Sequence, residues 1–195
     1  MKVEPVILEG EVVRLEPMTL EHLDGLWEAG KDEALWELIP TNVASIDDMR
    51  KYVESALADR GRGVALPFVT VERASGKVIG STRFGNIDTA NLRAEIGWTW
   101  ITPAFQRTAV NTEAKLLMLT HAFETWKCIR VELKTDALNE RSRAAIKRLG
   151  ATEEGLFRKH MICDTGRFRD SVYFSIIDTE WPMVKDNLRV KLSSK

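Results

Sequence analysis

The residues best suited to chemistry lie in one short stretch, 106–112, which reads QRTAVNT. Arg107 offers a guanidinium that can bind phosphate through paired hydrogen bonds, and Thr108 and Thr112 offer hydroxyl donors. An apolar segment with helical spacing follows, so the backbone N–H groups of this stretch would lie unpaired at a helix N-terminus, where they can bind phosphate. A simple capped helix with Asn111 as N-cap fits the same residues. The Walker pattern is missing, which argues against a nucleoside-triphosphate loop.

The composition limits the classes of protein to which this chain can belong. A chain of 195 residues with 44% hydrophobic residues suits one domain with a substantial core. The formal net charge of −1 argues against nucleic-acid or membrane-surface partners, which call for a basic excess. Cys128 and Cys163 show no metal-ligand spacing, so we expect free thiols and no metal. No apolar run suits a signal peptide or membrane span, and we therefore expect a cytoplasmic protein.

Periodicity and turn residues predict the elements that position this stretch. Thr19, with His22 three residues later, and Ser45 are the expected N-caps of the first two helices, and Gly150 is the expected stop of the last. Strands are expected at residues 12–15, 65–72, 77–87, 93–101, 129–135, 155–162 and 169–177, and helices at 20–29, 45–60, 112–126 and 139–149.

This order of elements predicts a mixed α/β fold with a single, mostly antiparallel sheet. The segment 93–135 forms a strand–helix–strand crossover, which should be right-handed and parallel. We expect one domain over residues 1–185 and a polar, frayed tail over 186–195. Along residues 93–101, simple alternation places Ile96, Trp98 and Trp100 on one face and Glu95, Gly97 and Thr99 on the other.

Three blocks of the sequence resemble the GNAT acyltransferases, and in particular their RimJ/RimL-type branch. They are EIGWTWITPAFQRTAVNTEA (95–114), LNERSRAAIKRLGATEEG (138–155) and GRFRDSVYFSIIDTEW (166–181). The matching positions in the first two are Glu95, Ile96, Gly97, Trp98, Pro103, Phe105, Gln106, Thr112, Glu113, Ala114, Asn139, Ser142, Leu149, Gly150 and Gly155. The resemblance covers nearly the whole chain and implies the GNAT fold, in which two central parallel strands splay apart.

The loop before the central helix departs from the family pattern. Arg107 and Ala109 replace glycines, and Asn111 stands where alanine or glycine is common. Glycine allows close backbone approach and a positive φ. The departures therefore predict a weaker affinity for a pyrophosphate group. The positive charge of Arg107 would offset this loss of affinity.

The resemblance implies that acetyl-CoA lies between the splayed strands as acyl donor. Its pantetheine arm would pair with backbone groups of one strand, as in β-augmentation. Asn139 would hydrogen-bond the pantetheine from the opposite wall, and the 3′-phosphate would meet Arg141, Arg143 or Lys115. The implied CoA-binding residues are Trp100, Ile101, Gln106, Arg107, Thr108, Ala109, Val110, Asn111, Thr112, Asn139 and Arg141.

The resemblance also implies direct attack of a primary amine on the thioester, which needs a base for the amine proton. Glu95 is our candidate base; the alternative is a carboxylate paired with Arg83 or Arg93. Ser142 is our candidate partner for the leaving thiolate, because Ile146 stands where many such enzymes carry tyrosine. The alternative for Ser142 is a hydroxyl bonded to local helix backbone.

The acceptor would be a protein N-terminus or a small-molecule amine. One rival hypothesis keeps the fold but uses another acyl donor such as succinyl-CoA, whose carboxylate Arg83 or Arg130 would meet. Another is a CoA-binding or interaction module without turnover. Trp36 is a candidate substrate contact, whereas His160 and Tyr173 are expected at the hairpin surface or in a polar contact. A homodimer through the last hairpin or the C-terminal segment is an open alternative.

Overall fold

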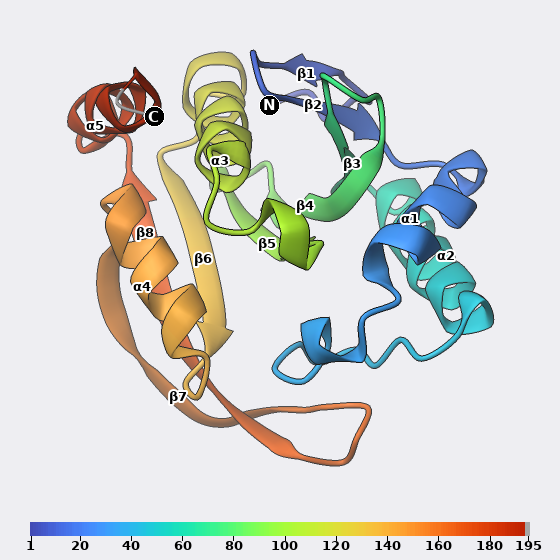
Figure 1. Ribbon diagram of the computed structural model, residues 1–195. Coiled ribbons are helices and arrows are strands. Elements are labelled where there is room, and N and C mark those ends of the chain that lie inside the picture. Colours follow the sequence, from blue (N-terminus) through green and yellow to red (C-terminus); the bar gives the residue numbers. More distant parts are fainter. Residues whose placement is uncertain (194–195) are drawn as a thin grey trace.

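The seven predicted strands and one further short strand, β1, assemble into one mixed sheet of eight strands in a computed structural model that describes residues 1–193 (Figure 1). The strand order is β1-β2-β3-β4-β5-β6-β8-β7, and every neighbouring pair is antiparallel except β5 and β6. This confirms the mixed α/β class and the parallel crossover. The strands are β1 Leu8–Glu9, β2 Val13–Pro17, β3 Leu66–Glu72, β4 Val78–Asp88, β5 Arg93–Ile101, β6 Arg130–Asp136, β7 Thr152–Ile162 and β8 Phe168–Ile177.

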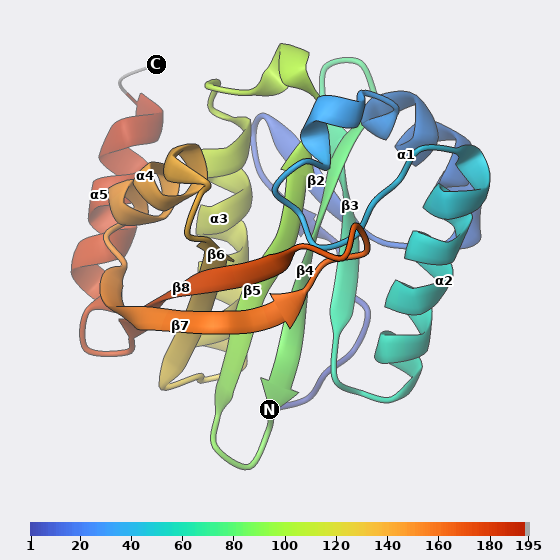
Figure 2. The ribbon, with the colours of Figure 1, turned by 90° about the horizontal axis from the view of Figure 1, so that it is seen from below.

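Helices cover both faces of the sheet, with α1 and α2 on one face and α3, α4 and α5 on the other (Figure 2). No helix within residues 1–193 has both the length and the apolar content needed to cross a membrane. The helices are α1 Leu23–Gly30, α2 Ile46–Gly61, α3 Val110–Thr120, α4 Glu140–Leu149 and α5 Trp181–Ser193, with short turns η1 Leu20–His22, η2 Glu33–Leu35, η3 Pro103–Phe105 and a π-turn η4 His121–Thr125.

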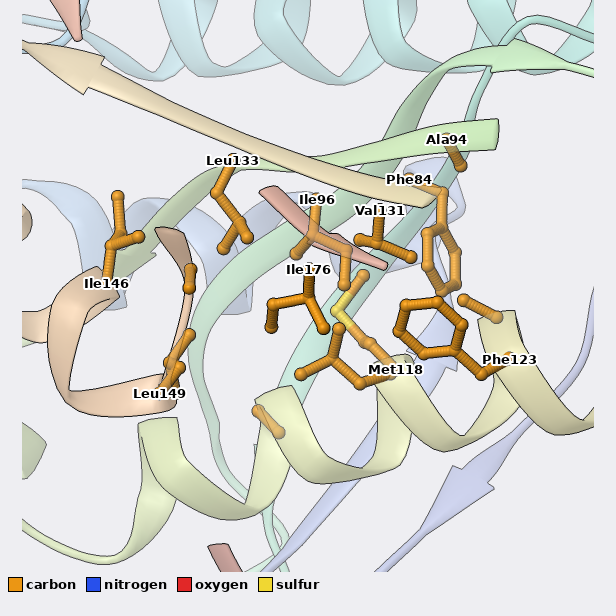
Figure 3. Close-up of a cluster of buried hydrophobic side chains, with 14 of the residues drawn as sticks. Phe84, Ala94, Ile96, Met118, Phe123, Val131, Leu133, Ile146, Leu149 and Ile176 are labelled. Atoms are coloured by element: carbon orange, nitrogen blue, oxygen red, sulfur yellow. The ribbon is translucent and has the colours of Figure 1, made fainter. Parts of the chain in front are cut away.

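Each face of the sheet has its own hydrophobic core. The larger core lies between the sheet and α3, α4 and α5, and Figure 3 shows Phe84, Met118 and Val131 packed within it. The smaller core lies under α1 and α2, where Leu26 and Met49 are fully buried. Because the sheet separates the two cores, successive side chains along one strand point alternately into one core and the other.

Three of the predicted helix ends, at Thr19, Ser45 and Gly150, are confirmed by local geometry, with Thr19 capping the short turn η1 that leads into α1. The Thr19 N–H donates to His22 Nδ1 at 3.1 Å, so the histidine ring takes the place of the usual glutamate in a capping box. Ser45 Oγ accepts from the Asp48 N–H at 3.2 Å at the start of α2. At the end of α4, Gly150 adopts a φ of 103°, the left-handed conformation that glycine favours.

The C-terminal segment differs from the expected frayed tail. Residues 186–193 belong to α5, whereas residues 194–195 lie outside the described part of the chain. Val184 and Leu188, one helical turn apart, are buried against the larger core, and the Trp181 ring stacks on Phe123 with centroids 5.3 Å apart. The sparse apolar positions on this polar segment are sufficient to hold it as an amphipathic helix.

Candidate functional site

β5 and β6 are paired over only a short length. The pairing covers the first residues of β5 and stops at Glu95 and Glu132. Beyond this point β5 continues beside β4 to Ile101, and β6 continues beside β8 to Asp136. The sheet therefore opens between its two parallel strands, as the resemblance implied.

A β-bulge at Trp98 adds one residue to β5. The register places Arg83 of β4 opposite Gly97. Two residues earlier on β4, Ser81 lies opposite Trp100, which is three residues later on β5. Trp98 has a φ of 50°, a conformation that is uncommon for a bulky side chain. An extra residue of this kind shifts the alternation of every side chain that follows it.

The predicted alternation along β5 is therefore wrong beyond the bulge. Ile96 lies in the larger core, whereas Trp100 lies in the smaller core on the opposite face. Thr99 turns toward α3, where its hydroxyl accepts from Lys115 Nζ at 2.6 Å. The strand thus contributes side chains to both faces close to the opening.

Backbone groups at the end of β5 also divide between the two sides of the strand. The Thr102 N–H donates to the Ile79 carbonyl of β4 at 2.8 Å. Groups two residues apart point the same way, so those of Trp100 also face β4 and those of Ile101 face the opening. The Ile101 carbonyl accepts from Gln106 Nε2 at 2.8 Å. Of the two residues expected to pair with a pantetheine arm, only Ile101 presents its backbone there.

Arg107 occupies an exposed turn between η3 and α3. Its φ of 62° lies in the left-handed region. This is a position where the family pattern has glycine, so the loop keeps a glycine-like backbone shape in spite of the substitution. Arg107 therefore adds an exposed guanidinium to the loop that precedes α3.

Helix α3 begins two residues earlier than predicted. Ala109 is the N-cap and makes no side-chain capping bond, while Thr108 Oγ1 accepts from the Val110 N–H at 3.3 Å. Asn111 lies inside the first turn, and its Oδ1 is buried with no partner among the described residues, so the interpretation of Asn111 as N-cap is wrong. The backbone N–H groups of Asn111 and Thr112 have no acceptor within the helix, since they lie in its first turn.

The start of α4 forms the facing wall. Asn139 Oδ1 accepts from the Ser142 N–H at 2.9 Å and caps the helix, which leaves the Asn139 amide nitrogen as a donor. Arg141 Nη1 donates to Gln106 Oε1 at 2.7 Å. Because Gln106 also binds the Ile101 carbonyl, this side chain links the two walls of the opening.

Glu95 is buried at the point where the strands separate, with 2% of its surface exposed. Its Oε2 lies 3.0 Å from Lys134 Nζ and accepts from Asn86 Nδ2 at 2.8 Å. Arg83 and Arg93 pair with other carboxylates. The expected alternative, a pairing of Glu95 with one of these arginines, is wrong, and the partner is a lysine from β6.

Lys115 does not lie where a 3′-phosphate contact requires. It points into the sheet from α3, and its Nζ donates to Thr99 Oγ1 at 2.6 Å and to Thr82 Oγ1 at 3.3 Å. Burial lowers the pKa of Lys115 to about 7. Within residues 1–193 it has no carboxylate at ion-pair distance. Sequence reasoning missed this site because helical spacing alone does not distinguish a core-facing lysine from a solvated one.

A half-buried polar cluster lies on the inner face of the β7–β8 hairpin. Lys134 Nζ is 5.8 Å from the ring centroid of Trp98 and 5.7 Å from that of Tyr173. His160 Nε2 lies 3.4 Å from the Tyr173 hydroxyl, and His160 Nδ1 lies 3.1 Å from the Ser171 hydroxyl. Burial, and then the positive charge of Lys134, lower the pKa of His160. His160 and Tyr173 are thus in polar contact beside the opening.

A cavity of about 560 Å³ lies on the α2 face next to this cluster. The tip of the β7–β8 hairpin reaches the chain between α1 and α2, as Figures 1 and 2 show, and the Asp164 N–H donates to the Pro40 carbonyl at 2.9 Å. This volume lies within the range of small-ligand sites. Its lining includes Asp48, Tyr52, Asp59, Arg83, Trp98 and Asp164.

Trp36 is a core residue and not a substrate contact. Only 3% of its surface is exposed, and its Nε1 donates to the Gly30 carbonyl at 2.8 Å. Its ring packs against Tyr52 and Trp100, with centroids 5.8 and 5.4 Å away. The expected contact is therefore corrected, because this tryptophan closes the smaller core beneath the cavity.

Both cysteines are buried free thiols, as predicted, and burial raises the pKa of Cys128 to about 11. Among residues 1–193, no cluster of three or more His, Cys, Asp or Glu side chains has the arrangement of a metal site.

The opened strand pair, the helix mouth and the facing α4 wall agree with a family assignment from sequence. The model of the acetyltransferase (GNAT) domain matches residues 13–152. The chain belongs to the GNAT family. The match covers both walls of the opening and most of the sheet, and it ends at Thr152, the first residue of the β7–β8 hairpin that borders the cavity.

Individual GNAT proteins resemble this chain to different extents. A Bacillus subtilis protein named "Putative ribosomal N-acetyltransferase YdaF" is 36% identical over 106 residues, which make up 54% of this chain and 57% of YdaF. A GCN5-related N-acetyltransferase from Brucella melitensis is 33% identical, with a TM-score of 0.91 over 98% of this chain and 87% of that chain. Mycobacterium smegmatis RimJ, in complex with CoA-disulfide, has a TM-score of 0.78 over 95% of this chain and 91% of RimJ; at 24% identity it supports the fold alone.

Proposed function

We propose that the protein transfers the acetyl group of acetyl-CoA to a primary amine by direct attack of the amine on the thioester. One observation carries this proposal: β5 and β6 separate beyond Glu95, and the backbone of Ile101 faces the opening beside the N-terminus of α3. An extended pantetheine arm can add to such an unpaired strand edge. The CoA-disulfide held by RimJ supports a CoA ligand for this fold.

In this proposal the loop 106–112 holds the pyrophosphate. The first-turn N–H groups of α3 and its helix dipole favour an anion there. Arg107 adds an exposed guanidinium, and its left-handed backbone gives the loop the shape that glycine provides elsewhere. These features favour a CoA-binding loop over the alternative of an interaction module that binds no CoA.

The α4 wall supplies the remaining contacts to the donor. The free amide nitrogen of Asn139 is placed to donate to a pantetheine carbonyl, and Arg141 stands beside Gln106 at the mouth of the opening. Ser142, in the first turn of α4, is the proposed hydrogen-bond donor to the leaving thiolate.

Glu95 is the proposed base, acting through a water molecule. Lys134 and Asn86 both bind its Oε2, so Oε1 makes no hydrogen bond within the described residues. A Cβ atom built on Gly97 would lie 2.9 Å from Oε1, so any larger residue at this position would crowd the oxygen. The ion pair with Lys134 holds the carboxylate at the opening while Oε1 receives the amine proton.

The acceptor is assigned here as a primary amine that enters through the cavity on the α2 face. The name of YdaF favours an amine of a ribosomal protein, and hence a cytoplasmic location, with a small-molecule amine as the alternative. Arg130 is a less favoured partner for the carboxylate of a longer, acidic acyl donor, because Glu132 and Glu154 already engage its guanidinium.

Calorimetric titration of the purified protein with acetyl-CoA and with CoA tests this proposal. We expect dissociation constants near the micromolar range, weakened about tenfold by Arg107→Ala because a charge-assisted phosphate contact is lost. Arg107→Gly removes the guanidinium side chain while allowing the left-handed backbone, so it should weaken binding to a similar extent. Arg189→Ala, at an exposed arginine of α5, is the matched control and should bind like the wild type. The absence of binding at millimolar acetyl-CoA contradicts the proposed function.

A further inference from the structure

Arg83 is a buried arginine held between two aromatic rings. Its surface is 3% exposed, and its Cζ lies 5.1 Å from the ring centroid of Tyr52 and 4.9 Å from that of Trp98. These two cation–π contacts restrict the guanidinium and shield it from water. The side chain nevertheless lines the cavity of about 560 Å³ on the α2 face.

The guanidinium N–H groups of Arg83 make no hydrogen bond to any residue within 1–193. The guanidinium has an ion-pair partner in Asp59, whose Oδ2 lies 3.6 Å from Nη1, a distance too long for a hydrogen bond. Asp59 is also bound by Arg62, so its charge is shared. The Nε of Arg83 is buried with no partner. Buried donors without acceptors are costly, which points to a ligand that supplies the acceptors.

The other charges at the cavity are already engaged. Asp48 binds the Ser45 hydroxyl and lies 3.2 Å from Lys51 Nζ. Asp164 accepts from the Asn42 N–H at 3.1 Å at the tip of the hairpin. Among these lining groups Arg83 is a buried cation whose guanidinium makes no hydrogen bond within residues 1–193. A planar oxyanion matches the paired donors of a guanidinium better than any neutral group.

We propose that Arg83 anchors a carboxylate group carried by the amine acceptor. This inference rests on the proposed function, and it narrows the acceptor to an amine that also bears a carboxylate, as in an amino acid or an acidic peptide. We assign the carboxylate to the acceptor and not to the acyl chain, because the residues that line the cavity come from α2, β4, β5 and the hairpin tip. The proposed donor contacts, Ile101, loop 106–112 and α4, do not line it.

Acceptor pairs that differ only in a carboxylate test this assignment. With acetyl-CoA saturating, CoA release is measured for alanine against alaninamide, which differ at the α-carboxylate, and for the peptide amides Asp-Ala-Ala against Asn-Ala-Ala, which differ at a side-chain carboxylate. For any pair that the enzyme acetylates, we expect kcat/KM to be about 10- to 100-fold higher for the acid than for the amide. This is the usual effect of a charge-assisted hydrogen bond. Arg83→Gln should reduce this ratio to about one, with acetyl-CoA affinity unchanged by calorimetry.

Two further variants keep the test decisive if Arg83→Gln unfolds. Arg83→Lys keeps the charge but loses the paired geometry, so the acid preference should fall while the fold persists. Asp59→Asn removes the competing carboxylate, and the acid preference should persist or increase. A wild-type ratio near one for every accepted amine, or a full ratio in Arg83→Lys and Arg83→Gln, overturns the proposal. Faster turnover of succinyl-CoA than acetyl-CoA, lost in Arg83→Gln, also overturns it and assigns the carboxylate to the donor.

The failure of this inference is distinguishable from the failure of the proposed function. If acetyl-CoA does not bind, the proposed function fails. If it binds but no amine in the panel is acetylated, NMR titration of the CoA-bound protein with glutarate and glutaramide still tests Arg83. Saturable shifts of the Trp98 indole signal with glutarate only, absent in Arg83→Gln, support the anchor. Equal or absent shifts with both probes overturn it.

Discussion

Two buried cations lie on opposite faces of the same strand pair, in contrasting surroundings. Lys115 reaches β4 and β5 from α3 and donates to the hydroxyls of Thr82 and Thr99. Arg83, the next residue after Thr82 on β4, extends to the other face, where aromatic rings and a cavity surround it. Within residues 1–193, Lys115 donates two hydrogen bonds but has no carboxylate partner, whereas Arg83 lies at ion-pair distance from Asp59 but has a buried Nε without an acceptor.

This difference teaches that burial of a charge does not by itself mark a ligand site. The decisive features are a buried donor without an acceptor and an adjacent cavity. Arg83 has both, whereas Lys115 donates to two hydroxyls and does not line this cavity. Substitutions on the α3 face should therefore act mainly on stability, and substitutions on the cavity face mainly on turnover. The following variants test that division.

Glu113→Ala should produce the largest loss of stability. The Glu113 carboxylate, at the start of α3, accepts from the N–H groups of Glu11, Val12 and Val13 at 2.7–2.8 Å. Its removal leaves these donors without their acceptor, and we expect a loss of about 3 to 5 kcal/mol in chemical denaturation. Glu113→Gln, which keeps one carbonyl oxygen, is the control and should lose less. Unchanged stability in Glu113→Ala would show that the α3 face does not depend on this carboxylate.

Glu95→Gln should lower kcat by about 100-fold, or roughly 2.7 kcal/mol, because the proposed base is lost while the side-chain volume is kept. The measurement is kcat at saturating acetyl-CoA, with the melting temperature recorded in parallel. Asn86→Ala removes the other hydrogen bond to Oε2 and leaves the carboxylate, so it should reduce kcat much less. A wild-type kcat in Glu95→Gln removes Glu95 from the mechanism.

Lys115→Met should stabilise the protein by about 2 kcal/mol, because methionine fills similar volume without desolvating an ammonium group. Thr82 and Thr99 remain paired through their hydroxyls, 2.8 Å apart, so the substitution leaves neither without a partner. Chemical denaturation and kcat are measured together. A loss of stability, or a large fall in kcat with the fold intact, would break the division between the two faces.

The stability difference between the wild type and Lys115→Met should depend on pH. Burial lowers the pKa of folded Lys115 from 10.5 to about 7. Below pH 7 both states bind the proton and the full destabilisation is present. Between these values only the unfolded state binds it, so wild-type stability rises with pH toward that of the variant, by up to about 1.4 kcal/mol per pH unit. A difference that stays constant from pH 6 to pH 9 would contradict a lowered pKa.

Local patterns predicted most of the fold but little of the cavity. The bounds of β5 and the caps Ser45 and Gly150 follow from turn and capping residues close in sequence. The bulge at Trp98 and the burial of Lys115 depend on contacts with β4, far along the chain, so periodicity could not reveal them.

The same limit applied to individual side chains of the candidate site. The resemblance located Glu95, but its partner Lys134 lies on a strand brought alongside only by the crossover. Arg83 was named among candidate cations, yet its stacking on Tyr52 and its lack of acceptors required the folded arrangement. The CoA and catalytic roles stay predictions until the binding and kinetic measurements are made.

The opening between β5 and β6 has a kinetic consequence. The proposed donor wall is reached from the α3 and α4 side of the sheet, whereas the cavity is reached from the α2 side. Because the two substrates approach from opposite faces of the sheet, both can be bound at the same time. The reaction then requires no acylated enzyme intermediate. Initial rates at several fixed acceptor concentrations should therefore give intersecting double-reciprocal lines, the signature of a ternary complex, and not the parallel lines of a ping-pong exchange.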